Sequence, residues 1–65
     1  MIIKNITKKN AKYYSIIGKG YNYIQKYNEA EEHYLKAIQL DPNDHWILIY
    51  LGDLYKKIKQ YDKAI

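Results

Sequence analysis

Two stretches that lie 34 residues apart, YSIIGKGY (residues 14–21) and LIYLGDLY (residues 48–55), decide the fold. In each, a glycine stands four residues after an aromatic or aliphatic residue and three before a tyrosine. After a shift of 34 residues, five pairs are identical: Gly18/Gly52, Tyr21/Tyr55, Ile24/Ile58, Tyr27/Tyr61 and Ala30/Ala64. A fixed period of this length is the signature of a repeat architecture.

The lysine between two glycines in the first stretch could suggest a phosphate-binding loop. That motif needs G-x-x-x-x-G-K-[ST] between a strand and a helix, and no strand pattern is present. The apolar spacing is helical instead, with one face formed by Tyr14, Ile17, Gly18, Tyr21 and Ile24. Gly18 and its repeat Gly52 are therefore predicted to be packing notches between helices, and Gly20 has no evident packing role.

A second helix is predicted after residues 25–28, with Asn28 as N-cap and Glu31 completing a capping box. Pro42 ends this helix, because proline cannot continue it. Its expected core residues are Ala30, Tyr34, Ala37, Ile38 and Leu40.

A third helix is predicted over residues 45–58, capped by Asn43 or Asp44. A break at residues 59–62 and a second N-cap at Asp62 predict the stub of a fourth helix. The expected apolar face of the third helix is Leu48, Leu51, Leu54, Tyr55 and Ile58.

This pattern resembles the tetratricopeptide repeat, whose consensus is an aromatic, L-G-x2-Y, A-x3-F and a proline in 34 residues. The residues that match are Tyr14, Ile17, Gly18, Tyr21, Ala30, Tyr34, Ala37 and Pro42, then Leu48, Leu51, Gly52 and Tyr55. The resemblance implies an all-α fold of antiparallel helix–turn–helix repeats. It divides the chain into a polar leader or frayed helix end at 1–10, one repeat at 11–44 and a shortened second repeat at 45–65.

The composition excludes several classes of function. The 65 residues include no cysteine, which excludes disulfides and thiolate metal sites. His33 and His45 lie twelve residues apart on different predicted helices, and Ser15 is the only serine, so we expect no metal site, no cofactor and no catalysis. No signal-peptide pattern or membrane-length apolar run is present, which predicts a cytoplasmic protein without membrane contact.

The resemblance also implies a function, because first helices of successive repeats line a groove that holds a peptide or a partner helix. Lysines there favour an acidic peptide, and Trp46 and Ile49 are candidate apolar anchors. A carboxylate clamp known in the family is not matched, since Ser15 and Lys19 stand where its lysine and asparagine pair should be, and Tyr50 stands where its later asparagine should be. The candidate groove residues are Lys12, Ser15, Lys19, Asn22, Trp46, Ile49, Asp53 and Lys56.

Two further expectations concern partners. The chain ends where the second repeat's second helix should begin, so the third helix is predicted to be partly uncovered. We expect a fragment of a longer array, the alternative being that another copy or another protein covers this surface. The alternative function is nucleic-acid binding, because nine tyrosines and a net charge of +4 could stack bases and neutralise phosphates. All eleven basic residues are lysine, so the side chain best suited to bidentate phosphate contact is missing, and most tyrosines occupy repeat-core positions.

Overall fold

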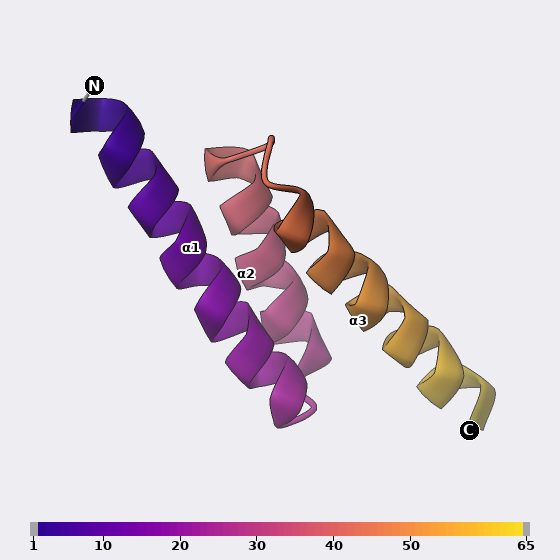
Figure 1. The fold of residues 1–65 in the computed structure, drawn as a ribbon. Helices are drawn as coiled ribbons and strands as arrows, with labels where there is room; N and C mark the ends of the chain where they lie inside the picture. The colour runs from indigo at the N-terminus through magenta and orange to yellow at the C-terminus, as the bar shows by residue number, and fades with distance from the viewer. Residues whose placement is uncertain (1, 65) are drawn as a thin grey trace.

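The computed structural model describes the backbone of residues 2–64 and the side chains of residues 7–60. Three helices fill this range: α1 (Ile2–Tyr23), α2 (Tyr27–Leu40) and α3 (His45–Ala64). Successive helices run antiparallel, and α2 lies between α1 and α3 (Figure 1). The packing of α2 on α1 is extensive, that of α3 on α2 is smaller, and α1 and α3 touch only marginally. This confirms the predicted all-α, repeat-like fold.

A close approach at Gly18 holds the first two helices together. A Cβ atom added to Gly18 would lie 2.8 Å from both Cδ1 and Cε1 of Tyr34 and 3.3 Å from the carbonyl oxygen of Ala30. The Tyr34 side chain is 1% exposed, so its ring has no room to move aside. Gly18 is therefore a packing notch, as predicted from the repeat.

The core has two clusters, and α2 contributes to both. Ala37 packs with Ala11 of α1 and Ile47 of α3, while Ala30 and Tyr34 pack with Leu54 of α3. Small residues on α2 allow helices to approach it on both sides, and aromatic rings fill the space beside them. The partly buried side chains around the clusters are Tyr14, Tyr21, Tyr27, Ile38, Leu40, Tyr50, Leu51 and Ile58.

The turn between α1 and α2 differs from the predicted capping box. Gln25 has a φ of 66°, the Lys26 N–H donates to the Tyr21 carbonyl at 2.8 Å, and the Gln25 N–H donates to the Asn22 carbonyl at 3.0 Å. This is a Schellman motif with glutamine in the left-handed position. It starts α2 at Tyr27, without a side-chain cap at Lys26, so the prediction of Asn28 as N-cap was wrong. Ile24 falls in this turn and is exposed, against the prediction that it faces the core.

The turn between α2 and α3 follows the prediction. The Asp41 N–H donates to the Ala37 carbonyl at 2.9 Å as α2 ends before Pro42. The Asp44 carboxylate accepts a hydrogen bond from the Trp46 N–H at 3.0 Å, which caps α3. Asp44 is therefore the N-cap residue that the sequence left open between positions 43 and 44.

The third helix corrects three predictions. It continues to Ala64 without the expected break and fourth-helix stub, since no glycine or proline follows Gly52 to end it. The Asp62 side chain lies outside the described side chains. The buried face of α3 is centred on Ile47 and Leu54, while Leu48 and Tyr55 are 52% and 44% exposed. The helix is thus rotated about its axis relative to the prediction. A Cβ atom added to Gly52 would meet no neighbouring side chain or helix within 4 Å, so no side chain fills a notch at Gly52.

The glycines provide a test of this packing. Gly18→Ala should lower the free energy of unfolding by about 1–2 kcal/mol, because the overpacking cost exceeds the gain in helix propensity. Gly52→Ala should raise it by about 0.5–1 kcal/mol, because alanine favours the helix and meets no neighbour. Urea unfolding followed by helical circular dichroism measures both. Equal effects of the two substitutions would contradict the packing described.

Candidate functional site: a groove between α1 and α3

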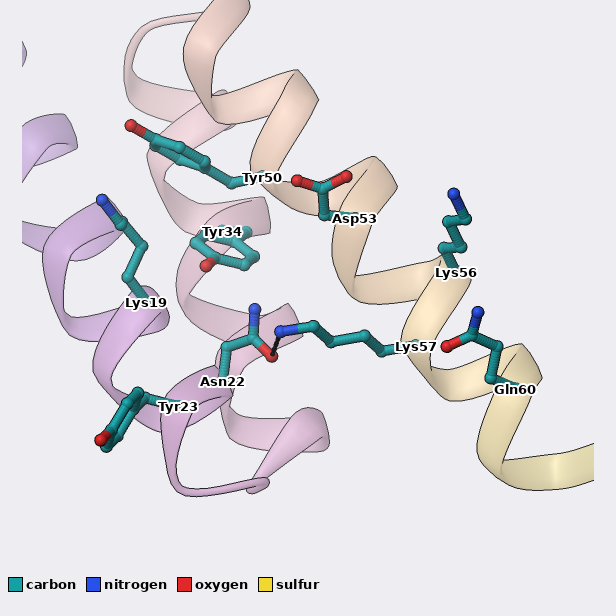
Figure 2. A pocket seen from close by; sticks show the side chains of 9 residues that line it. All are labelled: Lys19, Asn22, Tyr23, Tyr34, Tyr50, Asp53, Lys56, Lys57 and Gln60. Atoms are coloured by element: carbon teal, nitrogen blue, oxygen red, sulfur yellow. Dashed lines mark hydrogen bonds between the residues drawn. The ribbon is translucent and has the colours of Figure 1, made fainter. Parts of the chain in front are cut away.

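Two adjoining depressions form a groove between α1 and α3. They have volumes of about 480 and 590 Å³ and share Lys19 and Tyr50. We call them the polar half and the Trp46 half. The polar half is lined by Lys19, Asn22, Tyr23, Tyr34, Tyr50, Asp53, Lys56, Lys57 and Gln60 (Figure 2). The Trp46 half is lined by Lys8, Lys12, Ser15, Ile16, Lys19, Asp41, Asp44, Trp46, Ile47 and Tyr50.

Each wall of the groove is one stripe of a helix. Successive wall residues are three or four positions apart, which places them on one helical face. Because α2 separates α1 from α3, these two faces flank the groove and Tyr34 of α2 contributes to its lining. The stripe on α1 is Lys8, Lys12, Ser15, Lys19 and Asn22, and that on α3 is Trp46, Tyr50, Asp53 and Lys57.

Lys19 and Tyr50 interact where the two halves meet. The Lys19 ammonium lies 4.8 Å from the centroid of the Tyr50 ring, a cation–π distance. The Tyr50 ring in turn lies 6.1 Å from that of Tyr34, centroid to centroid. The Lys19 side chain therefore extends from α1 and places its positive charge over the Tyr50 ring of α3.

Asn22 connects the three helices in the polar half. Its Oδ1 accepts a long hydrogen bond from Lys57 Nζ at 3.5 Å across the groove (Figure 2). Burial raises the pKa of the Tyr34 phenol, a hydrogen bond with the Asn22 side chain partly offsets that rise, and the charges of Tyr50 and Asp53 add to it. Tyr34 therefore stays protonated at neutral pH and serves as a neutral part of the groove lining.

The predicted groove residues gather here with one exception. Lys12, Ser15, Lys19, Asn22, Trp46, Asp53 and Lys56 all line one half or the other. Ile49 lines neither, and its side chain is 47% exposed. Ser15 is 6% exposed and donates its hydroxyl hydrogen to the Lys12 carbonyl at 2.8 Å, so its polar group is already used within α1.

The sequence did not predict the other lining residues, which are Lys8, Ile16, Tyr23, Tyr34, Asp41, Asp44, Ile47, Tyr50, Lys57 and Gln60. The sequence predicted a groove-lining stripe of α3 through positions 46, 49, 53 and 56. In the structure this stripe runs through positions 46, 50, 53 and 57. Both series fit a helix, and the rotation of α3 about its axis decides between them. The burial of Ile47, which only the structure reveals, goes with the rotation that turns Tyr50 toward α1 and leaves Ile49 exposed, so the sequence carried no signal that separated the two series.

The histidines have structural surroundings. His33 Nδ1 donates a hydrogen bond to the Glu29 carbonyl at 2.8 Å, and its ring lies 5.0 Å from the Tyr21 ring between centroids. His45 lies beside Trp46 at the start of α3. Within the part of the chain that the structure describes, no group of three or more His, Cys, Asp or Glu side chains could hold a metal ion. No helix among the described residues is long and apolar enough to cross a membrane.

The fold and the groove define a class: antiparallel helical hairpins whose alternate helices form a groove wall. Two family models, each described as a tetratricopeptide repeat, match residues 11–44 and 33–65. Each match covers about half of the chain, and the chain belongs to the tetratricopeptide repeat family. Members are generally protein–protein interaction modules. Comparison with curated proteins and with solved structures gave no match.

Proposed function

We propose that the groove between α1 and α3 holds a peptide of a partner protein, with Trp46 as the main apolar anchor. The observation that carries this proposal is the exposure of Trp46. Its side chain is 56% exposed in the wall of a groove that also contains Ile16 and the Tyr50 ring. Tryptophan is the residue type most enriched among energetically dominant contacts in protein interfaces.

The charge of the groove favours an acidic partner. Five lysines and three aspartates line its two halves, which leaves an excess of two positive charges. Lys12, Lys19 and Lys56, expected to contact the partner from the sequence, are among them. Such charges increase the association rate of an acidic peptide and select against a basic one. The module binds and does not catalyse.

We propose further that residues 11–44 form one repeat and 45–65 begin the next, with 1–10 as an N-terminal extension. On this division α1 and α3 are the first helices of two successive repeats, and their facing stripes correspond. Ile49 would then contact a partner only where the partner extends beyond the Trp46 half.

Peptide binding can be measured through Trp46, the only tryptophan. The probes are end-capped ten-residue peptide pools with two apolar and three glutamate positions, and matched pools with lysine for glutamate. Acidic pools should bind at least fivefold more tightly. Trp46→Ala should weaken them about tenfold by calorimetry, because the apolar anchor is lost. Leu35→Ala, at an exposed apolar residue of α2 outside both halves, should change affinity less than twofold.

The alternative, nucleic-acid binding, is tested in the same experiment with a ten-nucleotide single-stranded RNA. Counterion release would make RNA affinity fall steeply between 50 and 200 mM salt. Tight, steeply salt-dependent RNA binding with no peptide binding would overturn the proposed function. Equal binding of acidic and basic pools would overturn the charge preference.

A second surface supports a second candidate function, self-association through α3. We infer that two copies of α3 pack antiparallel through the face that carries Leu48, Gly52 and Tyr55. Gly52 is open, and Tyr55 lies one turn away on the same face. The contact of Tyr34 with Gly18 is an example of how a tyrosine ring fills such a notch. A single face that carries both notch and ring is self-complementary, as a twofold interface requires.

Sedimentation equilibrium over 10 μM to 1 mM tests this association. The chain should dimerise reversibly at the upper concentrations, and Leu48→Lys should keep it monomeric because a charge would be buried at the contact. Ile49→Lys, at a similarly exposed residue on another side of α3, should leave the dimer intact. A monomeric wild-type chain at 1 mM, or equal effects of both lysines, would refute the α3 interface.

A further inference from the structure

The two halves of the groove differ in net charge. In the Trp46 half, Lys8 and Lys12 are matched in number by Asp41 and Asp44. In the polar half, Lys56 and Lys57 face only one carboxylate, that of Asp53. Lys19 belongs to both halves and lies over the Tyr50 ring at their junction. With Lys19 counted in both, the Trp46 half has an excess of one positive charge and the polar half an excess of two, and the Trp46 half also presents the Trp46 ring and Ile16.

The distance between the two ends follows from helix geometry. Trp46 and Lys57 are eleven residues apart on α3, which is close to three full turns, so both project from the same stripe. At 1.5 Å per residue they lie about 16 Å apart along the helix axis. An extended peptide rises about 3.3 Å per residue and covers that distance in about five residues.

We propose that this groove selects extended peptides in which an apolar side chain and an acidic side chain stand five positions apart. The inference rests on the proposed function and specifies its ligand. The apolar side chain lies against Trp46 and Ile16, and the acidic side chain is held by Lys56 and Lys57. The charge of Lys19 over Tyr50 disfavours a basic residue between them.

The charges also predict opposite effects of two neighbouring substitutions. Lys57 attracts the acidic side chain, whereas Asp53, in the lining of the same half, repels it. Lys57→Met should therefore weaken binding and Asp53→Asn should strengthen it. A role of either residue in folding alone would not produce effects of opposite sign that depend on the ligand's charge.

The experiment uses end-capped peptides of twelve Gly and Ser residues with one leucine and one glutamate. The glutamate stands two, five or eight positions from the leucine, in both chain orders, because the charges fix the spacing and not the direction. A peptide with glutamine five positions from leucine measures the apolar contribution alone. Affinities are read from Trp46 fluorescence at 50 mM salt, where surface charges act strongly.

The spacing of five, in at least one order, should bind about fivefold more tightly than spacings of two and eight and than the glutamine peptide. Lys57→Met should remove this advantage and leave the glutamine peptide unaffected, while Asp53→Asn should increase it two- to threefold. Lys36→Met, at an exposed lysine of α2 outside both halves, is the matched control and should change nothing.

The outcomes separate the two proposals. If all leucine peptides bind equally whatever the glutamate position, the spacing inference is wrong and the peptide groove stands. If no peptide binds and the pooled libraries also fail, both are wrong. If Lys57→Met and Lys36→Met weaken binding alike, the preference arises from overall charge and the assignment to the polar half is wrong.

Discussion

The contact between Gly18 and the Tyr34 ring is the constraint on which the rest of the structure depends. Any residue with a Cβ at position 18 would meet two ring carbons of Tyr34, a side chain that is itself almost fully buried. The glycine therefore determines how closely α1 approaches α2, and the ring fixes the position of the two helices along each other's axes. Ala30 and Ala37 extend the close approach along α2. His33, beside the rings of Tyr14 and Tyr21, fills the neighbouring part of the same interface.

The groove is a consequence of this packing. A small-residue helix between two others brings α1 and α3 near each other without letting them pack closely, as their marginal contact indicates. The space between them is bounded by side chains too long or too polar to be buried, chiefly lysines and the Tyr50 and Trp46 rings. The same residues that stabilise the hairpin therefore determine that a groove remains open beside it.

The fold could be predicted at positions where only one structural role explains the residue found there. Gly18, Ala30, Tyr34 and Ala37 were assigned correctly, because close packing restricts the residue that can serve, and capping narrowed the start of α3 to Asn43 or Asp44. The Asn28 cap failed because the Schellman turn at Gln25 starts α2 at Tyr27, whose partly buried ring joins the Tyr34 cluster.

The candidate site was only partly predictable for a different reason. A helical period shows which residues share a face, but not which face is turned toward the neighbouring helix. The rotation of α3 about its axis depends on what it packs against. The repeat aligned Leu48 with Tyr14 and so predicted a buried Leu48, but α3 packs through Ile47 in the cluster that Ala37 of α2 forms with Ala11 of α1. Tertiary contacts therefore set the rotation of α3, and this rotation places Tyr50 and Lys57 in the wall of the groove.

Proton NMR measures directly whether the Tyr34 ring fills the Gly18 notch. We expect strong nuclear Overhauser effects between the Gly18 α protons and the Tyr34 ring protons, with the α protons shifted upfield by the ring current. The corresponding protons of Gly52 should show no such effects in dilute solution. Gly18 α protons with random-coil shifts and no contact to Tyr34 would contradict the account.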